Sequence, residues 1–236
     1  LTVNQLVPIT KHYEVCEQVY DDLEHRVNTA VNPFYNDKAT LVFNAIERNG
    51  IKIDKNEFEK HFHPVENEFV YTSYNYKTLT TRPSNKFGGV NYAALSHKDG
   101  SRKSFIPRND IFVEFDIGAY HLTLAAMLVD YDFGIDSVHE HLAKHYGCSY
   151  EESKQRSFKL LYGGIDKQTR EKVPFFDLTH KYIYKKWNEI NTHNLVYTDM
   201  YRRKLLSNNY EDLNRNKLFN YLIQAYETES NIKKIL

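Results

Sequence analysis

Cysteine is scarce in this sequence, and its scarcity limits the possible functions. Among 236 residues there are two, Cys16 and Cys148. They lie far apart and form no Cys-x-x-Cys pair, which argues against a cysteine-based zinc framework and favours a reducing compartment. No apolar run approaches the ~20 residues that a membrane-spanning helix needs, and no leader peptide is visible. We therefore expect a cytoplasmic protein with no membrane partner.

The chain also lacks net charge, because 31 Lys and Arg balance 31 Asp and Glu. Overall attraction to nucleic acid is thereby excluded, so any nucleic-acid surface must be a local one. No G-x-x-x-x-G-K-S/T loop occurs, and no local context indicates a Ser/His/Asp or Cys/His triad. Aromatic residues are plentiful, with 19 Tyr and 14 Phe. They serve either as ordinary packing or as stacking platforms for bases.

Apolar residues spaced three and four apart predict a largely helical chain. The expected helices cover residues 11–30, 38–48, 135–147, 149–163, 166–188 and 212–235. Turn residues and apolar runs predict a short strand at 51–53, a hairpin around Lys98–Gly100 and a buried strand at 111–116. The fold class is therefore α/β (α+β), predominantly helical, with a small sheet.

Asp116 follows the apolar run and precedes a helical pattern. A strand holds such a carboxylate in place, and oxygen atoms are the ligands that Mg²⁺ prefers. The alternative is an aspartate that caps the following helix. Spacing alone leaves both interpretations open.

Two predicted helices carry polar or aromatic faces. Lys154, Phe158 and Tyr162 recur every four residues and share one face. An ammonium group suits phosphates, and rings suit a base and a sugar. The alternative is an ordinary amphipathic helix whose lysine extends into solvent. Asn220 and Gln224 lie one turn apart on the last predicted helix.

Taken in order, these segments resemble a family A (polymerase I-like) DNA polymerase of the phage-type branch. Phe115–Leu122 is similar to the family's motif A, and Lys154–Gly163 is similar to motif B. Thr81–Ser84 resembles the T-G-R segment upstream of motif A, and 216–224 resembles R-x-x-x-N-x-x-x-Q. The common order of these short motifs makes the resemblance specific.

The resemblance implies that Asp116 is the catalytic carboxylate, and that Asp116 and the Ile117 carbonyl bind two catalytic Mg²⁺ ions. It implies a site for the incoming deoxynucleotide (dNTP) made by four side chains: His121, Lys154, Phe158 and Tyr162. His121 replaces the family's usual Glu, which excludes the ribose 2′-hydroxyl. Five residues are expected to bind primer–template DNA: Arg82, Asn91, Arg102, Asn220 and Gln224.

The implied architecture is a right hand with a reduced thumb. Residues 1–70 would form the N-terminal helical region, 71–130 the first half of the palm, 131–200 the fingers, and 201–236 a palm helix preceding motif C. Motif C, the His-Asp-Glu turn with the second carboxylate, is not found, since no His-Asp pair follows Gln224. We expect a C-terminal fragment or a second polymerase chain to supply it. For a viral chain, the compartment would be the host cytoplasm.

Departures from the family pattern keep an alternative open. Tyr150 and Asn216 stand where the family has arginines. Together with the zero net charge, they favour a catalytically inactive module that binds nucleic acid or nucleotide. A weaker alternative is a capsid-associated or interaction protein with the same fold. A zinc site at His139–His145 is disfavoured, because the spacing differs from H-E-x-x-H.

Overall fold

The computed structural model describes residues 33–76, 78, 82–86, 89–200 and 202–235, and most of them are helical. The helix predicted at 11–30 lies outside these residues. The helices are α2 (Pro33–Asn49), α3 (Lys55–Phe58), α4 (Tyr120–Leu128), α5 (Val138–Tyr146), α6 (Tyr150–Gly163), α7 (Lys167–Lys172), α8 (Pro174–His193) and α9 (Arg215–Ile235). The 3-10 turns are η1 (Tyr92–Ala94), η2 (Ser101–Ser104) and η3 (Ser207–Asn209).

The described strands are short and form three antiparallel pairs. The pairs are β1 (Ile51–Lys52) with β2 (Phe69–Val70), β3 (Ser73–Asn75) with β4 (Ser84–Lys86), and β5 (Leu195–Tyr197) with β6 (Lys204–Leu206). The strand predicted at 51–53 is confirmed as β1, and Ile53 extends it through a bridge to Phe105.

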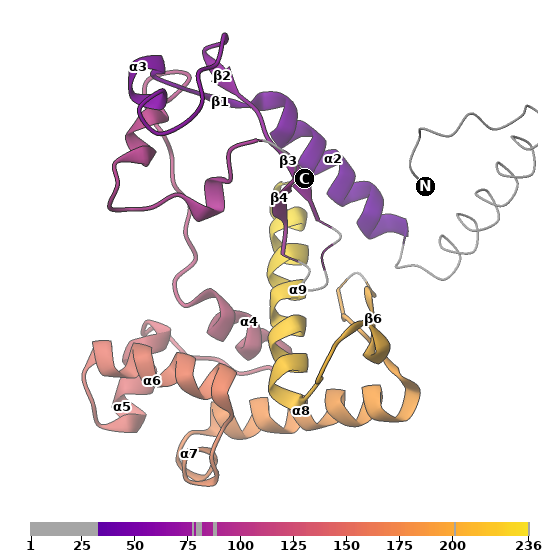
Figure 1. Ribbon diagram of the computed structural model, residues 1–236. Coiled ribbons are helices and arrows are strands. Elements are labelled where there is room, and N and C mark those ends of the chain that lie inside the picture. Colours follow the sequence, from indigo (N-terminus) through magenta and orange to yellow (C-terminus); the bar gives the residue numbers. More distant parts are fainter. Residues whose placement is uncertain (1–32, 77, 79–81, 87–88, 201, 236) are drawn as a thin grey trace, which may run out of the picture.

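Helix α9 joins two regions of the molecule (Figure 1). The first region, residues 33–106, holds α2, α3 and the first four strands. The second region, residues 119–235, holds α4 to α9, and the later turns of α9 pack against α2 of the first region. Residues 107–118 cross between the regions as a second, irregular connection. None of the described helices is long and apolar enough to cross a bilayer.

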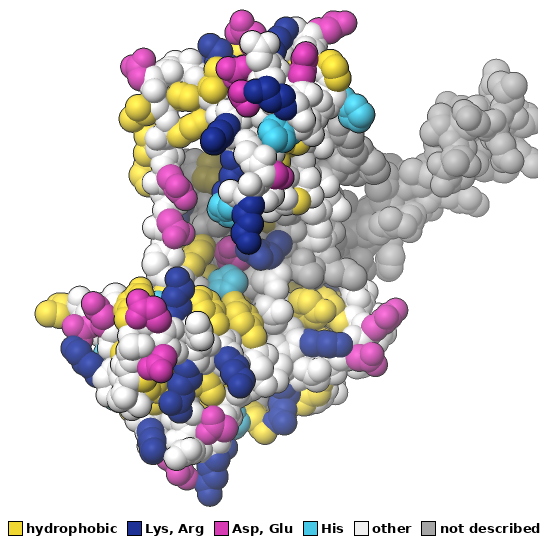
Figure 2. All heavy atoms as spheres, turned by 60° about the vertical axis from the view of Figure 1, so that its left-hand side comes forward, with side chains coloured by type: hydrophobic (Ala, Val, Ile, Leu, Met, Phe, Trp, Pro, Cys, Tyr) yellow, Lys and Arg dark blue, Asp and Glu magenta, His cyan; other side chains and the backbone are white. Residues whose placement is uncertain are grey.

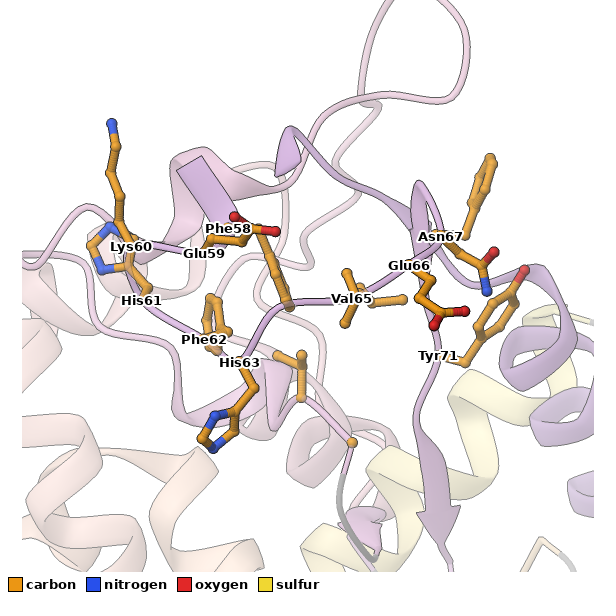
Figure 3. Close-up of a pocket in the computed structure, with 14 residues that line it drawn as sticks. Phe58, Glu59, Lys60, His61, Phe62, His63, Val65, Glu66, Asn67 and Tyr71 are labelled. Carbon is orange, nitrogen blue, oxygen red and sulfur yellow. The ribbon is translucent and has the colours of Figure 1, made fainter. Parts of the chain in front are cut away.

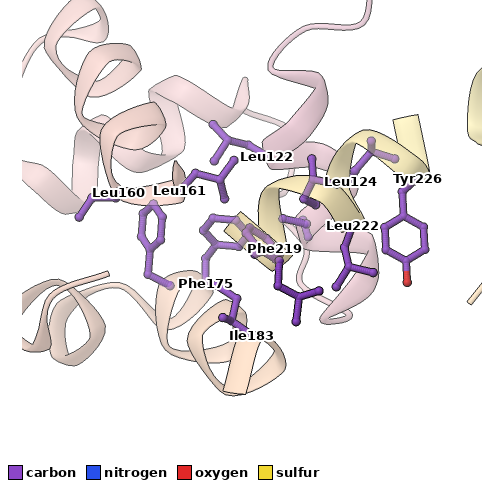
Figure 4. Packing of buried hydrophobic residues seen from close by; sticks show 14 of the residues in the cluster. Leu122, Leu124, Leu160, Leu161, Phe175, Ile183, Phe219, Leu222 and Tyr226 are labelled. Atoms are coloured by element: carbon purple, nitrogen blue, oxygen red, sulfur yellow. The ribbon is translucent and has the colours of Figure 1, made fainter. Parts of the chain in front are cut away.

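The main core lies in the second region, where α4, α6, α8 and α9 meet. Leu122, Phe175, Phe219 and Leu222 are fully buried there, and Figure 4 shows them gathered between these helices. Apolar burial on this scale holds the four helices in fixed relative positions.

Capping serines set the start of two helices. Ser137 begins α5 and Ser149 begins α6, each with a reciprocal bond to a glutamate three residues later. Gly147 ends α5 in the left-handed conformation, with φ 65°. The predictions of helices at 135–147 and 149–163 are therefore confirmed within the usual end uncertainty. The helices predicted at 38–48 and 212–235 are confirmed as α2 and α9.

The single helix predicted over 166–188 is wrong. Two helices, α7 and α8, meet at Val173, and Pro174 occupies the first position of α8. Proline has no N–H to continue a preceding helix but fits the first turn of a new one. The hairpin predicted around Lys98–Gly100 is also wrong, because Gly100 at φ 83° leads into the 3-10 turn η2.

The buried strand predicted at 111–116 is absent. These residues have no regular structure, and Ile111, Phe112, Val113 and Phe115 are 72%, 60%, 65% and 93% exposed. The prediction is wrong although the composition is that of a strand, because no described strand lies alongside to pair with these residues. A strand needs backbone partners, and apolar content alone does not provide them.

Candidate functional site

One face of α6 is open to solvent. Ser153, Ser157 and Leu161 are buried on the neighbouring side of the helix, whereas Lys154 is exposed. The half-buried rings of Phe158 and Tyr162 lie nearly parallel, with centroids 6.3 Å apart and planes 6° apart. The three predicted nucleotide-binding residues of α6 therefore share a face, as the spacing required.

His121, from the first turn of α4, completes this face. Its Nδ1 atom is hydrogen-bonded to the hydroxyl of Tyr162, and the two rings meet edge to face with centroids 5.9 Å apart. Burial raises the pKa of Tyr162 to about 12, so its hydroxyl keeps its proton at neutral pH. The segments that resemble motif A and motif B are thus in direct contact.

Glu227 on α9 joins the same cluster, and the sequence interpretation missed it. Its Oε2 atom lies 2.9 Å from His121 Nε2, and its Oε1 atom lies 3.3 Å from an Arg82 terminal nitrogen. Burial opposes ionisation, but the hydrogen bond from His121 and the charge of Arg82 hold the pKa of Glu227 below its usual value. Its place three residues after Gln224 was the one available signal.

The start of α9 lies beside the end of α6. Asn216 donates a hydrogen bond to the Gly163 carbonyl at 3.1 Å. Gln224 donates to Asn220 at 2.8 Å, which fixes the orientation of both amides. Asn216, Asn220 and Gln224 all remain partly exposed. The amide face of α9 and the aromatic face of α6 therefore belong to adjoining helices.

The other predicted DNA-binding residues lie in the first region. Asn91 is exposed just before η1, and Arg102 donates two hydrogen bonds to the Leu95 carbonyl, at 3.0 and 3.3 Å. On the face seen in Figure 2, Lys, Arg and His side chains gather near the hollow between the two regions. A cleft of 510 Å³ borders Arg82 and Glu227 beside α2. The DNA contacts of Asn91 and Arg102 stay predictions.

Asp116 is exposed at the end of the irregular segment, and its carboxylate accepts a hydrogen bond from the Ile117 amide at 2.9 Å. Across the described ranges, no three His, Cys, Asp or Glu side chains converge on a point where a metal ion would be held. Mg²⁺ binding by Asp116 and the Ile117 carbonyl stays a prediction. Among the histidines considered for zinc, His141 Nε2 is hydrogen-bonded to the Tyr131 hydroxyl at 2.9 Å. The ring centroids of His141 and His145 are 5.0 Å apart.

A hollow of 950 Å³ lies in the first region, away from this cluster. Figure 3 shows Lys60 and His61 at one end, Asn67 and Tyr71 at the other, and Val65 between them. Because these polar groups do not converge, the hollow has no evident ligand chemistry.

No family model matches the chain, and no curated protein matches it. Among solved structures, it is similar to the POL domain of Pol1 from M. smegmatis in complex with DNA primer-template and dNTP. The TM-score is 0.51, with 16% identity over 72% of this chain, and the match spans 37% of the other chain. This likeness shows the fold of a DNA polymerase domain, mostly helical with small two-stranded sheets.

Proposed function

We propose that this chain is the core of a DNA-directed DNA polymerase, which adds deoxynucleotides to the 3′ end of a primer. The contact between His121 and Tyr162 carries the proposal, because it places the motif A helix against the aromatic face of α6. The fold likeness to a polymerase solved with primer-template and dNTP supports it. The division into palm (71–130) and fingers (131–200) belongs to the same proposal.

Each side chain of the cluster has a chemical role in this scheme. The Lys154 ammonium binds the triphosphate, and the Phe158 ring stacks against the base. His121 and Tyr162 contact the sugar. Asn220 and Gln224 donate hydrogen bonds to the minor-groove acceptors that every correct base pair presents, so they check geometry without choosing a base.

Arg82, Asn91 and Arg102 contact primer–template phosphates and sugars, which position the duplex without reading its sequence. Their charges and amides are exposed, and Arg82 lies beside the cluster through its ion pair with Glu227.

Two Mg²⁺ ions, when bound, would activate the primer hydroxyl and neutralise charge on the leaving phosphates. Among the described residues, Asp116 and the Ile117 carbonyl would hold them only in part, and a second carboxylate is needed. We propose that a C-terminal fragment or a partner polymerase chain supplies it on a strand that pairs with residues 111–116. Residues 111–116 have exposed apolar side chains and no described strand beside them, and these are the features that strand addition uses.

The test is extension of a labelled primer by the chain purified from its source with its bound polypeptides. Asp116→Ala should abolish extension, whereas Glu114→Ala, an exposed acid two residues earlier, should retain it. Undiminished synthesis by Asp116→Ala would refute the role of Asp116. If the unmodified complex binds primer–template and dNTP but extends no primer, the catalytically inactive module is the correct alternative.

A further inference from the structure

The Glu227 carboxylate is bound by side chains from two other segments of the chain, and one of them contacts a third segment. Its two carboxylate oxygens have different partners, His121 Nε2 at 2.9 Å and Arg82 at 3.3 Å. The second nitrogen of His121 meets the Tyr162 hydroxyl. The Glu227 and His121 side chains are 18% and 16% exposed, so water does not replace these bonds freely. The arrangement constrains the protons of the imidazole.

The direction of each hydrogen bond follows from the ionisation of Glu227. Its lowered pKa keeps it a carboxylate at neutral pH, and a carboxylate only accepts hydrogen bonds. His121 Nε2 must therefore carry a proton. In a neutral imidazole the other nitrogen then has none, so Nδ1 accepts from the Tyr162 hydroxyl, whose raised pKa keeps it a donor.

Both ring nitrogens of His121 already have hydrogen-bond partners in this arrangement. An approaching group therefore meets only the C–H edge of the ring. A ribose 2′-hydroxyl pressed against that edge would lose water and gain no partner, which is unfavourable. We infer that Glu227 is a positioning residue that locks the Nε2–H tautomer and the orientation of His121, so that the His121–Tyr162 pair selects against ribonucleotides. The selection rests on the proposed function, whereas the lock does not.

The lock is tested on the isolated chain by ¹⁵N spectra of the His121 ring, recorded at an alkaline pH where the ¹⁵N shifts themselves show a single ring proton. The unmodified chain should show the Nε2–H tautomer. Glu227→Met, which removes the acceptor from a side chain of similar length, should shift the ring toward mixed tautomers, and Glu227→Gln should lie between. Asn231 lies one turn after Glu227 and accepts a hydrogen bond from Tyr120. Asn231→Ala removes that bond and should leave the His121 tautomer unchanged. An unchanged tautomer in Glu227→Met would overturn the lock.

The selection is tested by primer extension with dNTP and with rNTP, using the chain with its bound polypeptides. Glu227→Met should lower the preference for dNTP over rNTP about tenfold. This is a modest part of the ~10² by which an apolar pocket rejects an added hydroxyl. The change should come from a lower KM for rNTP, with kcat for dNTP unaltered, and Asn231→Ala should keep the full preference. An unchanged preference despite an altered tautomer would overturn the selection. Absence of synthesis by the unmodified complex would count against the proposed function instead, and the tautomer result would stand.

Discussion

The proposed site has two halves. Helices α6 and α9 form one half, which is held by the main core, and the exposed segment 111–116 forms the other. Tyr162 and Gln224 lie on helices whose other faces are buried in the main core. Asp116 ends an exposed apolar segment with no strand beside it among the described residues. Under the proposed function, the helical half would bind the nucleotide, and the metal site at Asp116 would need ligands from another segment.

A substitution in the main core, which holds α6 and α9, should have the largest effect on the free energy of unfolding. Phe219→Ala removes a ring that is 1% exposed, and the free energy of unfolding should fall by about 3–5 kcal/mol. Phe115→Ala removes a ring that is 93% exposed, and the change should stay within about 0.5 kcal/mol. Chemical denaturation of the isolated chain measures both. Similar losses for the two variants would show that 111–116 is already packed.

The open face of α6 gives a second comparison, between two lysines of one helix. Lys154→Ala should weaken dNTP binding about tenfold to hundredfold, because a charge-assisted phosphate contact contributes about 1.5–3 kcal/mol. Lys159→Ala removes an exposed charge that lies off this face, and it should change the affinity little. Titration with a fluorescent dNTP in the presence of primer–template gives the two values. Equal losses would point to nonspecific attraction.

A smaller effect is expected from pH. The pKa of Glu227 is lower in the folded chain than the ~4.3 of an unfolded glutamate, so its ionised form stabilises the fold above pH ~4.3. That stabilisation is lost as pH falls through the lower, folded value. The difference in Tm between the unmodified chain and Glu227→Gln should therefore be largest near neutral pH and shrink below pH ~4. A difference that is constant with pH would contradict an ionised Glu227.

Local signals in the sequence predicted much of the second region. The helices expected at 135–147 and 149–163 follow from apolar spacing, and the structure shows that Ser137 and Ser149 cap them through bonds that need no distant partner. The shared face of Lys154, Phe158 and Tyr162 follows from the helical period alone. These features depend on neighbours within a few residues, which is why they could be predicted.

Features that depend on distant partners could not be predicted. Residues 111–116 have the composition of a buried strand, yet a strand forms only when another lies beside it. Glu227 lies 106 residues from His121 in the sequence, and the fold alone brings the carboxylate to the ring. The same holds for Asn216, whose bond to the Gly163 carbonyl joins two helices 53 residues apart.

Calorimetric titration of the isolated chain with Mg²⁺ or Mn²⁺ tests the difference between the two halves most directly. Mg²⁺ prefers six oxygen ligands, and the Asp116 carboxylate with the Ile117 carbonyl supplies too few for firm binding. We therefore expect no tight stoichiometric site that depends on Asp116. A tight site present in the unmodified chain and lost in Asp116→Ala would contradict the account, because it would mean that this chain completes the metal site alone.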